Sequence, residues 1–391
     1  RERDQRAAQV IDMLNSFVRT LATADTEMSM TNLSDVSAFL DEASSNVDAL
    51  LLDHPELASK LHTSLSIAFV GRSDLDAAER EIRKALAIES RTPTAPGARR
   101  DVEQALGRVL WKQGRYDEAE GCYRRALEFD APAQERARTH HHLAATLQQL
   151  MRFDEAEAHW REALRLRHET LASDDPEILN SRNGLAVCRL QEGETSEAAT
   201  ELESVLASIR AYGIDNDFRV ARVAQNLARA DIDLGRLDEA EALLLEASSI
   251  IDAFFSGETI ERAPVEHELA RIALKRGEST DRARRAWEIR RHFLGETHHE
   301  TLESAVLMAQ ASGDLEAMRA AVDALASALP EGNWQVALAL EDLGVLEEAH
   351  GDATRARAAF ERALRDLQAH RPLGTTDIRR VAARLAAIGG S

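Results

Sequence analysis

Apolar and small residues recur along the chain at the spacing that places them on one face of an α-helix, and the helices come in pairs. In the first helix of each pair, one such residue stands eight positions before a recurring turn: Leu65, Leu106, Leu143, Leu185, Leu227, Leu269, Ala305 and Leu343. Second helices carry a matching pattern, such as Ala126-Leu127 or Ala363-Leu364. Because no alternating run of β-branched residues predicts a strand, we expect an all-α protein.

The turns between paired helices repeat a short motif. Residues 114–120 read G-R-Y-D-E-A-E, residues 151–157 read M-R-F-D-E-A-E and residues 235–241 read G-R-L-D-E-A-E. Weaker copies begin at residues 73, 193, 277, 313 and 351, so successive turns lie 36 to 42 residues apart. A near-constant period of this length predicts a right-handed α-solenoid of stacked helix pairs.

Each part of the turn has a physical role. Glycine ends the first helix because it adopts the left-handed conformation without a steric penalty. Asp-Glu then opens the second helix, where negative charge is favourable. The small Ala156 and Ala240 are expected to be buried between their paired helices. Met151 and Ser73 stand where other copies have glycine, and the copy at Gly277 is one residue longer, so we expect local irregularity there.

The ends of the chain differ from its middle. Residues 1–55 lack the repeat and show two amphipathic patterns joined by the polar stretch 25–32, which predicts an N-terminal helical cap or linker. Residues 56–370 hold about eight repeats, and residues 371–391 are expected to form a capping helix over the last apolar face. The chain begins at Arg1 without an initiator methionine, and we take it for a piece of a longer protein.

These turns and helix pairs resemble the tetratricopeptide repeat. The long period and the sequence from Leu294 to Leu302, L-G-E-T-H-H-E-T-L, resemble the extended variety found in kinesin light chains and in many bacterial signalling proteins. The resemblance implies an interaction module that binds a protein or peptide segment. Residues 1–7, R-E-R-D-Q-R-A, the amphipathic pattern after them and residues 50–57, L-L-L-D-H-P-E-L, resemble the region after the kinase domain of bacterial serine/threonine protein kinases. That resemblance implies the sensor or scaffold part of such a signalling protein.

Composition narrows the function classes. Lys and Arg number 48 against 68 Asp and Glu, and the resulting net charge of −20 repels phosphate backbones, which argues against nucleic acid as a partner. The same charge is also what a solvated helical surface rich in glutamate would carry. No run of eighteen apolar residues predicts a membrane span. Location therefore stays open between the bacterial cytoplasm and the outer side of a membrane that the parent protein crosses.

No catalytic constellation is present in the sequence. It has no glycine-rich phosphate loop, no His-Arg-Asp loop and no Asp-Phe-Gly, so we expect neither enzymatic activity nor a cofactor. His140, His141 and His142 are consecutive, and consecutive residues on a helix project about 100° apart, which argues against a shared metal. Cys122 and Cys188 fit no metal spacing and are expected to be buried thiols.

First helices line the inner surface of such a solenoid, and their exposed positions are the candidate ligand contacts. Counting from the apolar residue of each first helix selects a set rich in amides and cations: Arg108, Lys112, His141, Asn183, Arg222, Gln225, Arg229, His267, Arg271 and Lys275. In peptide-binding members of the family, such side chains hold a peptide's backbone and carboxylates. Arg222, Arg229, Arg271 and Lys275 are expected to be solvent-facing and to form one positive strip that selects an acidic peptide.

Three other interpretations remain open at this stage. The candidate residues could instead be solvated helix faces paired with nearby acids. The chain could be a structural scaffold that self-associates through the ends of the solenoid. It could also be a regulatory module for a linked protease, since similar arrays accompany caspase-like domains.

Overall fold

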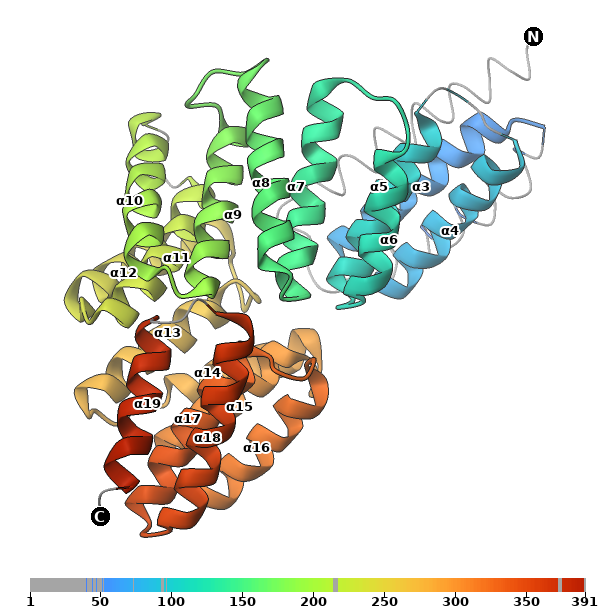
Figure 1. Cartoon of the computed structure of the whole chain (residues 1–391). Helices are drawn as coiled ribbons and strands as arrows, with labels where there is room; N and C mark the ends of the chain where they lie inside the picture. The colour runs from blue at the N-terminus through green and yellow to red at the C-terminus, as the bar shows by residue number, and fades with distance from the viewer. Residues whose placement is uncertain are drawn as a thin grey trace. The chain divides into compact units, whose positions relative to one another are not determined.

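The computed structural model describes residues 40, 44, 47, 51, 53–72, 74–92, 95, 97–213, 217–371 and 375–389. In this part the chain is all-α, with seventeen helices and no strand (Figure 1). The two amphipathic patterns expected within residues 1–55 lie almost wholly outside the described residues. The division into residues 1–55, 56–370 and 371–391 therefore stays a prediction.

Sixteen of the described helices form eight consecutive pairs, and a seventeenth follows the last pair. The pairs are α3 (Pro55–Gly71) with α4 (Leu75–Arg91), α5 (Ala98–Lys112) with α6 (Tyr116–Leu127), α7 (Ala133–Gln149) with α8 (Phe153–His168), α9 (Pro176–Glu192) with α10 (Thr195–Ala211), α11 (Phe218–Leu234) with α12 (Leu237–Phe254), α13 (Arg262–Arg276) with α14 (Arg282–Leu294), α15 (His299–Ser312) with α16 (Leu315–Ala328), and α17 (Trp334–Ala349) with α18 (Ala353–His370). The helix after them is α19 (Thr376–Gly389), which packs on α18. The predicted all-α array of helix pairs is confirmed.

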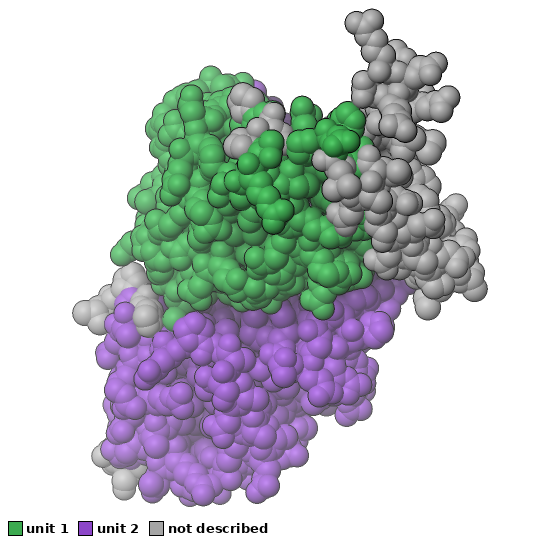
Figure 2. All heavy atoms as spheres, turned by 90° about the vertical axis from the view of Figure 1, so that its right-hand side faces the viewer, with its two compact units in different colours: residues 1–171 green, residues 172–391 purple. Residues whose placement is uncertain are grey.

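The chain divides into two compact units, residues 1–171 and 172–391 (Figure 2). Unit 1 contains α3 to α8, and unit 2 contains α9 to α19. Each unit buries its own apolar residues between paired helices. In unit 2 a large cluster joins α9 to α13 and is built around Leu202, Ala224, Leu244 and Ile251.

The expected helix contacts are confirmed through most of the array. Ala156 and Ala240 have no exposed surface. The predicted apolar positions from Leu65 to Leu269 are also buried. The prediction is wrong for Ala305 and Leu343, which are only half-buried. In α15 the buried apolar positions are Val306, Leu307 and Ala309, so its packed face is rotated in the short seventh repeat.

Two glycines within first helices allow an aromatic ring of the paired helix to reach the backbone. A Cβ built on Gly107 would lie 2.8 Å from the ring of Tyr123, and one built on Gly344 would lie 2.6 Å from the ring of Phe360. Both rings are almost completely buried. A side chain at either glycine would therefore push the two helices of its pair apart.

The turns follow the expected glycine chemistry, with one exception in unit 1. Met151 has φ of 58°, the left-handed conformation that glycine adopts at equivalent turns, such as Gly235 with φ of 81°. The turn at Gly277 is longer than its counterparts, because α14 begins only at Arg282. These irregularities agree with the sequence prediction, while Ser73 lies outside the described residues.

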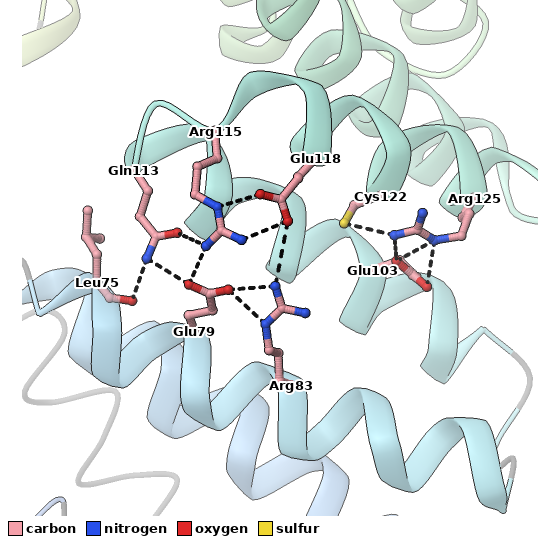
Figure 3. Close-up of polar contacts among 9 residues, drawn as sticks. All are labelled: Leu75, Glu79, Arg83, Glu103, Gln113, Arg115, Glu118, Cys122 and Arg125. Carbon is pink, nitrogen blue, oxygen red and sulfur yellow. Dashed lines mark hydrogen bonds and ion pairs between the residues drawn. The ribbon is translucent and has the colours of Figure 1, made fainter. Parts of the chain in front are cut away.

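An arginine next to several turns joins successive repeats on the second-helix side. Arg115 donates to Glu79 of the preceding second helix at 2.7 Å and to Glu118 of its own second helix at 2.6 and 2.7 Å (Figure 3). Equivalent inter-repeat pairs recur along both units: Arg152 with Glu120, Arg236 with Glu203, and Arg276 with Glu241. Part of the chain's large acidic content is therefore used to bind turn arginines.

The buried alanines provide a direct test of the helix register. Ala156→Leu and Ala240→Leu are each expected to lower the free energy of unfolding by about 1–3 kcal/mol, because the larger side chain overpacks the contact between paired helices. Ala158→Leu and Ala242→Leu are matched controls at exposed positions of the same helices. Chemical denaturation of the four variants checks the prediction. Equal stability of the buried and exposed variants would show that the register is wrong.

The three consecutive histidines of α7 face three different partners. His140 Nδ1 lies 2.8 Å from His159 Nδ1, His141 packs its ring edge-to-face on Trp160, and His142 stacks on Tyr123. The His141 and His142 rings meet edge-to-face, but the three side chains do not converge on one point, and no group of three metal-ligating residues occurs in the described part of the chain. Burial lowers the pKa of His140 to about 4, with a further contribution from His159, and burial lowers the pKa of His142 to about 4.

These depressed pKa values predict a loss of stability of unit 1 in mild acid. The unfolded chain binds protons at a histidine pKa of about 6.5, whereas the folded chain resists protonation until near pH 4, so stability falls as the pH drops below 6.5. Between pH 7 and pH 5 we expect a loss of about 1–2 kcal/mol per histidine. Urea unfolding at both pH values checks this.

The paired variant His140→Gln/His142→Gln should show a smaller difference in stability between pH 7 and pH 5 than the wild type. His168→Gln, at an exposed position of α8, is the control and should retain the full pH dependence. A paired variant with wild-type pH dependence would contradict the assignment to His140 and His142.

Candidate functional site

The ten predicted contact residues fall into both units. Arg108 and Lys112 are exposed on α5 of unit 1, and His141 is half-buried on α7. The other seven lie on α9, α11 and α13 of unit 2: Asn183, Arg222, Gln225, Arg229, His267, Arg271 and Lys275. We call the surface formed by the first helices α9, α11, α13, α15 and α17 the first-helix face of unit 2. It is the candidate site because it holds most of the predicted residues.

Amide and guanidinium groups form cross-links between α9 and α11. Asn226 Nδ2 donates to Asn183 Oδ1 at 3.0 Å, and Arg222 Nη2 donates to Asn180 Oδ1 at 2.5 Å. Asn183 is 8% exposed, while Arg222 is exposed and Gln225 half-buried. The predicted residues Asn183, Arg222 and Gln225 are thus brought together on neighbouring helices. Asn226 belongs to the same group, and sequence reasoning missed it.

Acidic residues interrupt the positive strip that was expected on this face. Arg271 donates to Asp233 of α11 at 2.7 Å and to Glu268 of its own helix at 2.6 Å. Burial acts to raise the pKa of both carboxyl groups, but the charge of Arg271 outweighs it and holds each pKa below its usual range. The Arg271 side chain is 23% exposed, so the expectation of a solvent-facing cation is wrong there. Lys275 is exposed, as predicted.

His267 is held within unit 2 by polar neighbours. Its Nδ1 lies 3.4 Å from both Ser304 Oγ and Arg290 Nη1, and Arg290 also donates to Ser304 at 2.8 Å. Burial, followed by the positive charge of Arg290, lowers the pKa of His267 to about 3. The imidazole is therefore neutral at physiological pH and contributes hydrogen bonding rather than charge.

Arg229 meets two residues from the end of the array. Its guanidinium carbon lies 5.1 Å from the centre of the Trp334 ring, and that of Arg371 lies 5.2 Å from the same ring centre. Trp334, the first residue of α17, is 5% exposed, and Arg371, just after α18, is 7% exposed. Helices α11 and α17 of unit 2 therefore meet here although two first helices separate them along the chain.

The same region contacts the turn after α9. A Cβ built on Gly193 would lie 2.9 Å from Thr375 Cγ2 and 3.6 Å from Arg371 Nη1. Arg371 also forms an ion pair with Asp377 of α19. Sequence reasoning missed Trp334 and Arg371, because they reach the first-helix face only through this long-range contact. No motif in the sequence distinguishes Trp334 from the other three tryptophans of the chain.

Inter-repeat pairing continues into the last helix. Arg380 of α19 donates to both carboxylate oxygens of Glu341 in α17 at 2.6 and 2.7 Å. Glu341 is 4% exposed and Arg384 lies 3.4 Å from it. A bidentate arginine–carboxylate pair is stronger than a pair joined by a single hydrogen bond, so this contact fixes α19 against α17.

Comparison with known sequences agrees with this geometry. Sequence models described as tetratricopeptide repeat match residues 102–131, 135–211 and 220–251. The chain carries tetratricopeptide repeats. No curated protein sequence matches the chain significantly. None of the helices in the described ranges combines the length and apolar character needed to cross a bilayer.

Solved structures share the fold of this tetratricopeptide-repeat chain. A Rap protein complexed with Competence and Sporulation Factor superposes with a TM-score of 0.64 at 15% identity, covering 98% of this chain and 99% of that one. The Rap conjugation gene regulator of plasmid pLS20, in complex with the Phr* peptide, gives 0.60 at 12% identity over 89% and 98%. The apo quorum sensor NprR from B. thuringiensis gives 0.54 at 12% identity over 92% and 99%. At these identities the likeness concerns the fold alone.

Proposed function

We propose that this chain is a non-catalytic interaction module that binds a peptide or an extended protein segment on the first-helix face of unit 2. The observation that carries the proposal is the group of amides and cations on α9 and α11, which contains Asn183, Arg222, Gln225 and Asn226. Side-chain amides both donate and accept hydrogen bonds, as an extended peptide backbone requires. Two of the structures with this fold are described as complexes with Competence and Sporulation Factor and with the Phr* peptide.

The alternative is that these groups satisfy one another and bind nothing. A soluble mixture of random heptapeptides is incubated with the protein, and retained peptides are identified by mass spectrometry after gel filtration. We expect a defined subset to be retained. The double variant Arg222→Ala/Gln225→Ala should bind the selected peptides at least tenfold more weakly, measured by fluorescence anisotropy with labelled peptides.

The matched control lies in unit 1. Arg108→Ala/Lys112→Ala removes the two exposed candidates of α5 and should leave affinity for the selected peptides unchanged, with circular dichroism confirming that both variants fold. If the two double variants bind the selected peptides with the same affinity, the peptide site lies elsewhere on the protein. A mixture from which no peptide is retained would contradict the proposed function.

The wider role belongs to the same proposal. The N-terminal resemblance supports a bacterial signalling protein, such as a serine/threonine kinase, in which this array is the sensor or scaffold part. Self-association through the array is the competing structural role. Analytical ultracentrifugation at several protein concentrations separates the two roles. A self-associating scaffold should increase in molecular mass with concentration, whereas a peptide-binding module need not.

A further inference from the structure

We infer that Arg229, Trp334 and Arg371 form a carboxylate-binding site at the end of the first-helix face of unit 2. This inference rests on the proposed function and names the group that the face recognises on its peptide. The site would hold a carboxylate of the bound segment, from its C-terminus or from an acidic side chain.

The first argument is the arrangement of the two guanidinium groups. Both lie over the ring of Trp334, at 5.1 and 5.2 Å from its centre, although Arg229 comes from α11 and Arg371 follows α18. Contact with the ring fixes a planar guanidinium without using its N–H groups. Nη1 of Arg371 already donates to Asp377, and the remaining N–H groups of the two side chains match the two oxygens of a carboxylate.

The second argument is that donors at this place lack acceptors within the described part of the chain. Arg371 is 7% exposed, and its Nε is buried without a hydrogen-bond partner, as is Thr375 Oγ1 beside it. Buried donors without partners are rare because each has given up its hydrogen bonds to water without a replacement. An incoming oxygen that accepts from these groups would supply that replacement, so the site favours an acceptor ligand.

The third argument is the balance of charge. Arg229 and Arg371 carry two positive charges, and Asp377 in its ion pair with Arg371 offsets one of them. Asp233 and Glu268 also face Arg229, and Arg271 offsets only one of these two carboxylates. The charges around the site therefore nearly balance, and a singly charged carboxylate meets less repulsion there than a doubly charged phosphate.

The position of the site also fits a peptide on the amide groups. Gln225 and Arg229 are four residues apart on α11 and therefore share one side of that helix. The turn at Gly193, which follows α9, packs against Thr375 and Arg371. A segment whose backbone is held by the amides of α9 and α11 could thus place its carboxylate between the two arginines.

The test uses the indole N–H resonance of Trp334, assigned by comparison with Trp334→Phe, in the isotope-labelled full chain. Three probes are titrated: acetyl-tetraalanine with a free C-terminus, the same peptide as its C-terminal amide, and acetyl-Ala-Asp-Ala-Ala amide. Saturable shifts are expected with the free acid, the Asp-containing amide or both, which distinguishes the terminal from the side-chain source. Tetraalanine amide should cause none, and sodium phosphate should bind more weakly than the effective probe.

Variants assign the effect to the guanidinium groups. Arg229→Gln should weaken binding of the effective probe at least tenfold, and Arg229→Lys should weaken it less because the charge remains. Arg284→Gln, at an exposed position of the second helix α14 in the same unit, should bind normally. The inference is wrong if neither acidic probe shifts the resonance. It is also wrong if tetraalanine amide binds as tightly as the acidic probes, or if phosphate binds more tightly than they do.

The outcome can be separated from that of the proposed function. If heptapeptides selected on the wild type lose no affinity when their carboxylates are blocked, the carboxylate site is wrong while peptide binding stands. If no heptapeptide is selected, the proposed function fails, and the tetraalanine titration alone decides whether the site binds a carboxylate.

Discussion

Trp334→Ala is expected to lower the free energy of unfolding of unit 2 by about 3–5 kcal/mol, the usual cost of truncating a large buried aromatic residue. The side chain is 5% exposed, and two guanidinium groups pack on its ring. Its removal leaves a cavity and also takes away the surface on which Arg229 and Arg371 meet. Urea unfolding, followed by amide exchange in α11 and α17, measures the effect.

Trp287→Ala is the matched control for this substitution. Trp287 is half-buried on α14, where Arg291 lies 4.4 Å from its ring centre, so it has a similar cation contact but less burial. We expect a clearly smaller loss of stability, with exchange in α11 and α17 unchanged. Equal losses from the two substitutions would show that the contact between α11 and α17 adds nothing.

Arg271→Glu is expected to destabilise unit 2 by about 3–5 kcal/mol, because reversing one partner of a partly buried network leaves like charges together. The new carboxylate would face Asp233 and Glu268, which Arg271 now holds ionised. Thermal and urea unfolding measure the loss. Lowering the pH towards 4 should relieve part of it, since the carboxylates can then take up protons.

Arg222→Glu provides the comparison for this reversal of charge. Arg222 is exposed on the neighbouring α11 and bonds to an amide, Asn180, rather than to an acid. Its reversal should change stability by less than about 1 kcal/mol, as is usual for exposed charges. If both reversals are equally mild, Arg271 is a solvated cation, as the sequence had predicted, and the acidic network contributes little.

The architecture could be predicted from the sequence because its causes are local. A turn glycine, the acids that follow it and a small residue such as Ala156 act within one helix pair, and the period repeats them. The prediction was wrong where neighbours decide the outcome. Ala305 and Leu343 occupy the expected sequence positions, but the packing of the short seventh repeat and of the last repeat leaves them half-exposed.

The candidate site was less predictable for the same reason. Counting along the first helices correctly predicted that Asn183, Arg222 and Gln225 lie on neighbouring helices of one unit. The charge state of the surface was not predictable, because Asp233 pairs with an arginine 38 residues away. Trp334 and Arg371 reach Arg229 only through the folding back of unit 2, which no local pattern of residues indicates.

The two cysteines give each unit an internal reporter of its own opening. Cys122 lies in unit 1 and Cys188 in unit 2, and both thiols are buried with at most 1% exposure. Burial raises the pKa of the Cys122 thiol to about 12, so little reactive thiolate exists in the closed state. A thiol reagent such as Ellman's reagent should therefore react at the rate at which each unit transiently opens. Single-cysteine variants would then compare the opening rates of the two halves of the array without any attached label.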